Sequence, residues 1–416
     1  MHVIRILLLT NRDWDNVGDQ LIEAGVISLI RAAMGNLGFT GEQFEIDSRD
    51  AELVPTRYRF TEDPSLLEPA REAISKADVL VFGGSPLFNY AYQDFYLRTI
   101  KTLQIAHEFG VPAILSSIGV EAFDGENPKA IALREALALP VVRQITTRDD
   151  LASLEQFVAG TDTPIALVSD PAVYTDVVVP RKPAATREKK RIGLMVTRAG
   201  IFKDNQIPFT AKKQRAFWQD VIVELTARGY DYRLFTTGHF ADEVLLDLMV
   251  REDGIPAKKV ALTVNSPEEL RAQLAMCDGV IAYRLHASVA AFAYGIPAIG
   301  LSWNPKVTSF FEGIGYPERA LEHERWTATD VVPAVEQAMA EGVLKDEEQL
   351  ASVYTTLFAG LKGVLAPESD AVGYASHELR ERLPRYPGTG PTEYRAKVTR
   401  KMRRLYDGYR ARAYKS

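Results

Sequence analysis

Arg284 and His286 are the residues whose types and spacing point most directly to chemistry. They follow a short apolar run, Gly279 to Tyr283, and precede a small-residue run with helical character, Ala287 to Tyr294. In open parallel sheets, ligands sit outside the carboxyl ends of strands, at the N-termini of the helices that follow. An arginine there can grip a phosphate or carboxylate, and a histidine beside it can act as a general acid. The pattern therefore predicts an anion site with a proton donor.

Further polar side chains fall at the carboxyl ends of other predicted strands. Several are cationic, and the densest group lies in the second half of the chain. They are Asn16, Asp19, Ser85, Arg148, Asp170, Arg198 and His239, with Asn304 and Lys306 after the last strand. The structural alternative is that each arginine pairs with a carboxylate, such as Asp170 or Asp278, and only ties elements together. That alternative loses weight when several cations recur at one sheet edge.

The elements that must position these residues alternate as strand and helix. We predict strands at 3–10, 44–46, 78–82, 113–118, 144–147 and 165–168, and again at 192–197, 232–235, 260–264, 279–283 and 298–301. Such alternation is typical of parallel sheets covered by helices on both faces. A charged, proline-rich linker is expected at 179–191. We therefore expect an α/β fold with two doubly wound Rossmann-like domains, 1–180 and 190–345, and a helical extension, 346–416.

Three local patterns add detail to these elements. Asn16-x-Gly18-Asp19 ends a polar loop, and Asp19 either caps the next helix or faces a ligand. The pair Gly83-Gly84 after a strand lets backbone approach a ligand closely, although alone it is a weak signal. Ser266-Pro267, with Glu269 three residues after the serine, marks a sharp helix start.

Composition excludes several classes of function. Among 416 residues with a net charge of −6 and a single Cys277, nothing indicates nucleic-acid binding, a disulfide framework or a cysteine zinc site. Cys277 lies in an apolar setting typical of a core residue. Loops for ATP or dinucleotides and zinc-binding histidine pairs are absent. The apolar run Val3 to Leu9 is interrupted by Arg5 and is typical of a first strand, so a cytoplasmic protein is expected.

The chain from Pro391 onward is basic, with about nine Lys and Arg residues interleaved with Tyr394, Tyr406, Tyr409 and Tyr414. One interpretation is contact with anionic lipid, at the inner face of a membrane, or with a polymer. The other is a helix with a solvated charged face, or a disordered end. Aromatic residues in such tails often pack back on the parent protein, which favours the second interpretation.

Taken in order, these motifs resemble the polysaccharide pyruvyl transferase family. The resemblance runs from about residue 3 to about residue 315. The segment R-L-H-A, followed by a G-x-P turn and a P-K-V segment, is its most specific part. The motifs are Asn16-x-Gly18-Asp19, Gly83-Gly84-Ser85, Thr147-Arg148-Asp149, Asp170-Pro171, Val196-Thr197-Arg198, Arg284-Leu285-His286-Ala287 and Asn304-Pro305-Lys306-Val307.

The resemblance implies a fold like that of GT-B glycosyltransferases and a donor, phosphoenolpyruvate, whose pyruvate unit becomes a ketal on a sugar. By the family pattern, His286 is the general acid, and Arg198 and Arg284 hold the donor's phosphate and carboxylate. Leu285 would line the donor pocket and Lys306 would be a further phosphate contact. On the acceptor side the candidates are Asn16, Asp19, Gly83, Gly84 and Asp170. No metal or organic cofactor is expected, since the donor already carries the activation.

Two other hypotheses are compatible with these residues. A GT-B glycosyltransferase using a nucleotide sugar needs similar cations for its anionic donor. A non-catalytic relative that binds an anionic glycan, or assembles with synthesis enzymes, is the other. Stabilisation by a nucleotide sugar or by phosphoenolpyruvate separates the first hypothesis from pyruvyl transfer.

Overall fold

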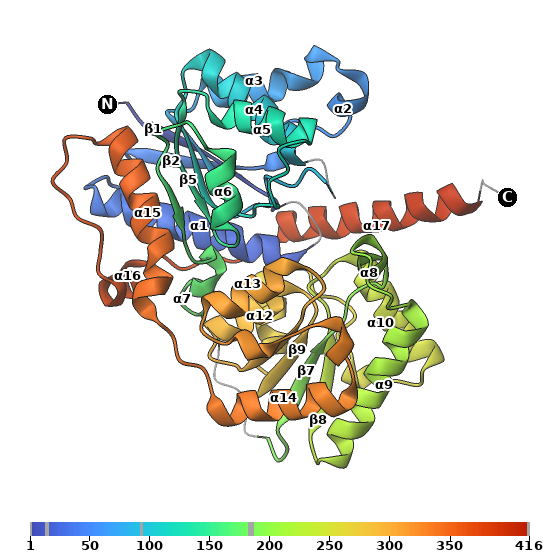
Figure 1. Ribbon diagram of the computed structural model, residues 1–416. Coiled ribbons are helices and arrows are strands. Elements are labelled where there is room, and N and C mark those ends of the chain that lie inside the picture. The colour runs from blue at the N-terminus through green and yellow to red at the C-terminus, as the bar shows by residue number, and fades with distance from the viewer. Residues whose placement is uncertain (1, 13–15, 92–94, 182–186, 414–416) are drawn as a thin grey trace. The chain divides into compact units, whose positions relative to one another are not determined.

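Parallel sheets covered by helices make up the computed structural model, which describes residues 2–12, 16–91, 95–181 and 187–413 (Figure 1). Contacts between residues divide the chain into two units. The first unit contains Met1–Arg12, Ile22–Tyr174 and Asp346–Pro384. The second contains Asp13–Leu21, Thr175–Lys345 and Arg385–Ser416. The expected α/β class with two doubly wound sheets is confirmed.

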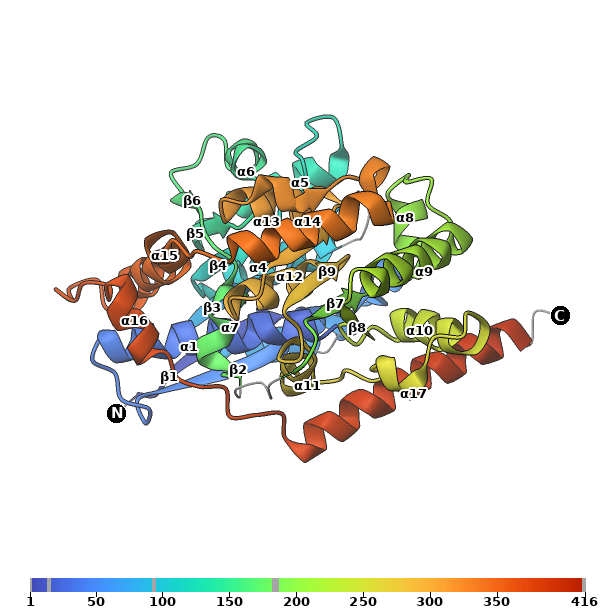
Figure 2. The ribbon, with the colours of Figure 1, turned by 90° about the horizontal axis from the view of Figure 1, so that it is seen from below.

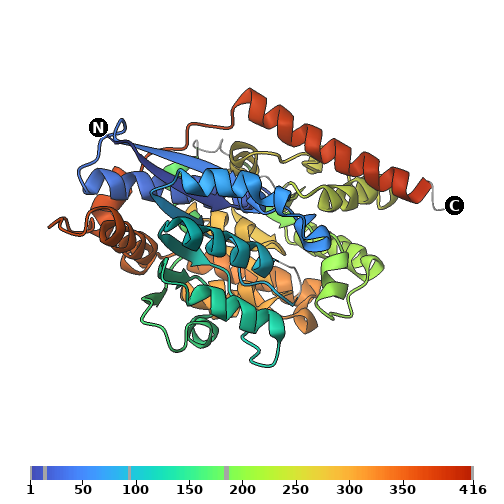
Figure 3. The ribbon, with the colours of Figure 1, turned by 90° about the horizontal axis from the view of Figure 1, so that it is seen from above.

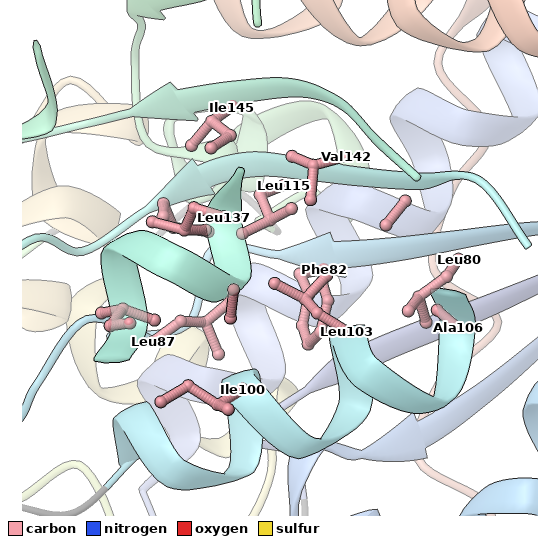
Figure 4. Close-up of a cluster of buried hydrophobic side chains, with 14 of the residues drawn as sticks. Leu80, Phe82, Leu87, Ile100, Leu103, Ala106, Leu115, Leu137, Val142 and Ile145 are labelled. Carbon is pink, nitrogen blue, oxygen red and sulfur yellow. The ribbon is translucent and has the colours of Figure 1, made fainter. Parts of the chain in front are cut away.

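In the first unit the described residues form a six-stranded parallel sheet in the order β2-β1-β3-β4-β5-β6. Its central strands β3 and β4 are buried along their whole length, as expected for a sheet covered on both faces. Side chains from Leu80 to Ile145 pack between this sheet and helices α4 and α5 (Figure 4). The strands are β1 Ile4–Thr10, β2 Phe44–Asp50, β3 Val79–Gly83, β4 Ala113–Ile118, β5 Val142–Thr147 and β6 Ile165–Leu167.

Helices pack on both faces of this first sheet. Helices α3, α4 and α5 lie side by side over one face (Figure 3). Helix α15 packs against β4 and β5, and the Gln144 amide donates a hydrogen bond of 2.9 Å to the Thr356 carbonyl. The helices are α1 Val17–Asn36, α2 Tyr58–Thr61, α3 Glu68–Ser75, α4 Phe95–Phe109, α5 Pro128–Leu137, α6 Leu151–Phe157, α15 Glu347–Leu365 and α16 Ser376–Arg382.

The second unit repeats the plan with a five-stranded parallel sheet in the order β11-β10-β9-β7-β8 among the described residues. Its strands are β7 Arg191–Met195, β8 Asp231–Phe235, β9 Gly279–Ala282, β10 Ala298–Leu301 and β11 Ala320–Leu321. Its helices are α7 Thr175–Val178, α8 Gly200–Asp204, α9 Ala211–Ala227, α10 Phe240–Glu252, α11 Pro267–Leu274, α12 Leu285–Ala293, α13 Pro305–Gly313, α14 Ala328–Glu341 and α17 Pro391–Ala413.

Both sheets share one strand order, in which the first strand lies between the second and the third. The direction of winding therefore reverses between β1 and β3 and between β7 and β9. At such a switch point the loops after the two strands diverge to opposite faces and leave a crevice for a ligand. Arg198 follows β7 and Arg284 follows β9, so the switch point of the second sheet positions both arginines.

Several sequence expectations differ from the structure. The strand expected at 260–264 is reduced to an isolated parallel bridge between Val260 and Leu234 of the edge strand β8. Residues 182–186 of the expected linker lie outside the described residues. We expected 346–416 as a separate extension. The contacts instead group residues 346–384 with the first unit and 385–416 with the second.

Candidate active site in the second unit

Arg284 lies where the sequence predicted, at the elbow between β9 and α12. The strand residues before it are fully buried, and Arg284 itself takes the extended N-cap position of α12, with φ −80° and ψ 123°. The elbow is braced from the next loop, because the Trp303 indole donates a hydrogen bond of 2.6 Å to the Tyr283 carbonyl. This local geometry presents the arginine at the carboxyl end of the sheet.

Asp242, in the first turn of α10, organises the arginines. Its carboxylate is fully buried and accepts hydrogen bonds from Arg284 Nε at 3.0 Å and Arg284 Nη2 at 3.1 Å. The same carboxylate accepts from the backbone N–H of Arg198 at 2.9 Å and from the Thr197 hydroxyl at 3.3 Å. One carboxylate therefore holds the Arg284 guanidinium and fixes the turn after β7 that carries Arg198.

The Arg198 guanidinium has no carboxylate partner among the described residues. Its Nε is buried and makes no hydrogen bond, and the hydroxyl of Thr237, in the turn after β8, is also buried without one in the described part of the chain. A buried guanidinium N–H is costly to leave unsatisfied. A bound anion would supply the missing acceptor. Arg284 pairs with a carboxylate, as expected of an arginine that only connects elements of the fold, but Arg198 does not.

His286 is the second residue of α12, and its side chain is 8% exposed. The N-terminus of α1 packs against it. A Cβ atom added at Gly18 would lie 2.6 Å from His286 Cβ and 2.8 Å from its Nδ1. The backbone N–H of Val17 donates a hydrogen bond of 2.7 Å to the Thr237 carbonyl, which holds this turn in the second unit. Glycine at position 18 is thus dictated by the close approach of the imidazole.

Leu285 and Lys306 begin two neighbouring helices of the second unit. Leu285 is the first residue of α12 and is half-buried. Lys306 lies in the first turn of α13, after Asn304 at the N-cap, and is also half-buried. The Asn304 Oδ1 atom is buried without a hydrogen-bond donor in the described part of the chain. Both helix starts follow strands of the same sheet, β9 and β10.

The acceptor-side candidates divide between the two units. Asn16, rather than Asp19, caps α1, since its side chain accepts from the Gly18 N–H at 3.2 Å, and Asp19 lies in the first helical turn. Both are grouped with the second unit, which also contains His286. We had expected both in an N-terminal domain, and the contacts of the α1 start explain the difference.

Gly83, Gly84 and Asp170 belong to the first unit. Gly84 has φ +63°, and a Cβ there would collide with Ile22 of α1, so packing of α1 requires a glycine. Asp170 is buried and forms an ion pair of 2.7 Å with buried Arg148. This pair has the geometry of a tie between the segments after β5 and β6. Whether Asp170 also serves an acceptor stays a prediction.

Sequence reasoning missed Asp242, the centre of the arginine network. It lies inside helix α10, 42 residues before Arg284 in sequence, and is not at a strand end. One signal was available, because β8 is followed by the polar turn Thr236-Thr237-Gly238-His239 and the aspartate comes in the next helical turn. Carboxylates in a first turn are usually read as helix-dipole partners, which concealed this role.

Three further findings concern metal binding, the cysteine and membrane spans. Among the described residues, no group of three His, Cys, Asp or Glu side chains is placed to hold a metal ion. Cys277 is buried, and burial raises the pKa of its thiol to about 12. A thiol that stays protonated is a poor nucleophile, so Cys277 is a core residue, as its apolar setting predicted. In the same part of the chain no helix is long and apolar enough to cross a bilayer.

The paired doubly wound sheets define a GT-B-like fold, and solved structures agree. A UDP-N-acetylglucosamine 2-epimerase from Methanocaldococcus jannaschii is 12% identical, with a TM-score of 0.54 over 85% of this chain and 98% of that one. A putative UDP-N-acetylglucosamine 2-epimerase from Listeria monocytogenes is also 12% identical, with a TM-score of 0.54 over 90% of this chain and all of that one. At such identity the likeness shows the fold alone.

The family follows from the sequence itself. The family described as "Polysaccharide pyruvyl transferase" matches residues 16–305, which is more than half of the chain. The chain belongs to the polysaccharide pyruvyl transferase family. The matched region contains Arg198, Arg284 and His286. No protein with a curated description matches the chain.

Proposed function

We propose that this protein transfers the pyruvate unit of phosphoenolpyruvate to a sugar of a polysaccharide or its precursor, forming a cyclic ketal and releasing phosphate. The observation that carries the proposal is the second unit's arginine pair. Arg198 and Arg284 leave adjacent strands at the switch point around one buried carboxylate, and His286 lies two residues beyond Arg284. Family membership supports the class of reaction.

The donor carries two anionic groups, a phosphate and a carboxylate, and arginine binds each of them bidentately. Arg284 is already oriented by Asp242, so it is preorganised for one anion at little further cost in entropy. Arg198, whose Nε makes no hydrogen bond, would bind the other. Lys306, in the first turn of α13, would add a contact to the phosphate, and Leu285 would line the pocket.

The chemistry needs one proton donor at the donor's methylene carbon. His286 protonates that carbon, which becomes a methyl group, and an oxocarbenium-like centre forms at the neighbouring carbon. A sugar hydroxyl attacks this centre and loses its proton. The bond to the phosphate oxygen then breaks, phosphate leaves, and a second hydroxyl of the same sugar closes the ketal while losing its own proton. One of the two hydroxyl protons restores His286 and the other leaves with phosphate.

On the acceptor side, Asn16 and Asp19 are the candidates in the unit that holds His286. An aspartate near the reacting hydroxyl would orient it or accept its proton. Gly83, Gly84 and Asp170 remain candidates from the first unit, with the packing and pairing roles described above. The residues invoked supply binding, orientation and proton transfer without requiring a metal or organic cofactor.

The test is incubation of the full-length protein with phosphoenolpyruvate and a panel of glycan acceptors, followed by phosphate release and the ketal methyl signal in NMR. We expect ketal formation with at least one acceptor, and a loss of about a hundred-fold or more in rate for His286→Ala. An unchanged rate in His286→Ala would refute the assigned role. If phosphoenolpyruvate binds but no panel member yields a ketal, the non-catalytic glycan-binding hypothesis gains.

A further inference from the structure

Helix α17, the basic end of the chain, is fixed to the second unit by one of its faces. It runs alongside α10 and α11 (Figure 2). Lys397 Nζ donates a hydrogen bond of 2.7 Å to the Asn265 carbonyl, and Lys401 Nζ donates one of 3.0 Å to the Asn265 side chain and pairs with Glu243. Both lysines are almost fully buried, at 3% and 5% exposure. They anchor the helix and so determine which face points away.

Tyr394 adds to this anchor, since its hydroxyl donates a hydrogen bond of 2.9 Å to Glu269. The expectation that tail aromatics pack back on the protein is therefore confirmed for Tyr394. It does not hold for Tyr406, which is 59% exposed. Tyr414 lies outside the described residues. The helix thus separates its aromatic residues into an anchoring one and an outward one.

The outward face of α17 combines arginines with large apolar side chains. Its members are Arg395, Met402, Arg403, Tyr406 and Arg410, all exposed, and they recur at separations that place them on one side of an α-helix. Met402 is 60% exposed, and the Arg410 guanidinium lies 5.8 Å from the centre of the Tyr406 ring. At 100° per residue, the two acidic residues of the helix, Glu393 and Asp407, both fall on one flank of this face.

The charge of this face contrasts with that of the rest of the chain. Residues 391–416 contain nine basic and two acidic residues, in a chain whose net charge is −6. An anionic surface therefore attracts this end and repels the remainder, which orients the protein. If this face packed against the same face of a second copy of the chain, arginines would lie opposite arginines and repel one another. A soluble polyanion would satisfy the arginines but would leave Met402 and Tyr406 in water.

We propose that this outward face of α17 docks on an anionic lipid bilayer. The arginines bind lipid phosphates, while Met402 and Tyr406 enter the boundary between head groups and acyl chains, as in other helices that lie in a membrane interface. Because the buried lysines hold α17 on the second unit, docking of the helix also holds Arg198, Arg284 and His286 of that unit at the membrane. The proposal concerns binding of the protein to a surface and stands without regard to the donor or the acceptor.

The experiment is co-sedimentation of the full-length protein with phosphatidylcholine vesicles, with and without phosphatidylglycerol. We expect binding to the anionic vesicles alone, weakened by added salt. One unit of charge near an anionic surface changes binding about five-fold, so Met402→Glu/Arg403→Glu, which changes the charge by three units, should lower binding about a hundred-fold. Circular dichroism and the melting temperature should stay unchanged, because the anchoring lysines are untouched.

A matched control carries the same change in charge on another helix of the same unit. Lys212 and Val223 of α9 are both exposed, Val223 at 68%, and Lys212→Glu/Val223→Glu should bind vesicles like the wild type. Equal binding of wild type to neutral and anionic vesicles, or equal loss in both double variants, would overturn the proposal. So would heparin binding without vesicle binding, or a dimer in light scattering that the α17 variant dissociates. Ketal formation is not measured, so failure here leaves the proposed reaction untouched.

Discussion

At the scale of single residues, the donor site depends on one buried carboxylate. Asp242 accepts two hydrogen bonds from Arg284 and two from the turn that bears Arg198, and it is wholly shielded from water. A buried ion pair is a poor source of net stability, but removing one partner leaves the other uncompensated. Asp242 is a positioning residue whose loss should affect both folding and donor binding.

Asp242→Asn keeps the shape of the side chain but replaces one accepting oxygen by an amide nitrogen, which donates. It should lower the free energy of unfolding by about 3 kcal/mol, because Arg284 loses its counter-charge. Urea denaturation measures this. Asp247→Asn on the same helix removes an exposed ion pair with Arg251 and should cost less than about 0.5 kcal/mol. Binding of phosphoenolpyruvate should weaken in the first variant and not in the second. Equal effects in both would contradict a special role for Asp242.

Gly18→Ala tests the contact between the α1 turn and the imidazole. The added methyl group would lie 2.6 Å from His286 Cβ, so His286 must shift. A displacement of about 1 Å can cost about a hundred-fold in rate, and we expect that loss in ketal formation. Gly35→Ala, in the same helix but with open space around it, should keep full activity. Wild-type activity in Gly18→Ala would mean that His286 is not in the reacting position.

The residues of the donor site differ in how well the sequence alone predicts them. Arg284, His286 and Arg198 follow strands directly, and a strand followed by a charged elbow and a helix is a local pattern. Asp242 approaches them only because α10 returns over the sheet, which is a property of the fold. The capping role of Asn16 was likewise hidden, since Asn16 and Asp19 are both good caps and the loop conformation decides between them.

At the scale of elements, the glycine pair Gly83-Gly84 in the elbow at the end of β3 allows helix α1 to pack against this turn. Gly84 adopts a left-handed conformation, and Ile22 of α1 occupies the space where its side chain would be. Glycine at this position lets a helix of the same unit approach closely. The sequence motif predicted the close approach of a ligand, and the neighbour of Gly84 in the structure is the side chain of Ile22.

Gly84→Ala should therefore destabilise the protein by more than backbone strain alone. Gly110→Ala provides the comparison, since Gly110 has a similar φ of +70° but open space around it, and it should cost about 1 kcal/mol. Gly84→Ala should cost about 1–3 kcal/mol more because of the collision with Ile22. Thermal or urea unfolding measures the difference. If the two variants are equally stable, packing of α1 does not explain the elbow.

The capping pattern of α11 shows a local prediction that succeeded. The Ser266 side chain accepts from the Glu269 N–H, and the Glu269 carboxylate accepts from the Asn265 N–H at 2.5 Å, as expected of a capping box. The same short segment then receives Tyr394, Lys397 and Lys401 of α17. That second use was not predictable, because it joins residues more than 120 positions apart.

At the scale of the whole molecule, alternation of strands and helices was enough to predict two doubly wound sheets. Strand order was not predictable, since it depends on which side each crossover takes. The order matters for function, because it places the switch point of the second sheet between β7 and β9 and so brings Arg198 and Arg284 to one carboxylate. The end of the chain divides between the two units for a similar reason, since its helices find partners far away in sequence.

Donor choice is the central claim, and it separates this account from a nucleotide-sugar transferase with the same fold. UDP-N-acetylglucosamine serves as the representative nucleotide sugar in this comparison. Donor binding can be measured without knowing the acceptor. The variant Arg198→Gln removes a donor contact, and Lys203→Gln, at an exposed lysine of α8, is its control.

The most direct measurement is calorimetric titration of the full-length protein with phosphoenolpyruvate and, separately, with UDP-N-acetylglucosamine. We predict that phosphoenolpyruvate binds, that Arg198→Gln weakens it about ten-fold or more, and that Lys203→Gln leaves it unchanged. Binding of the nucleotide sugar with no binding of phosphoenolpyruvate would contradict the account.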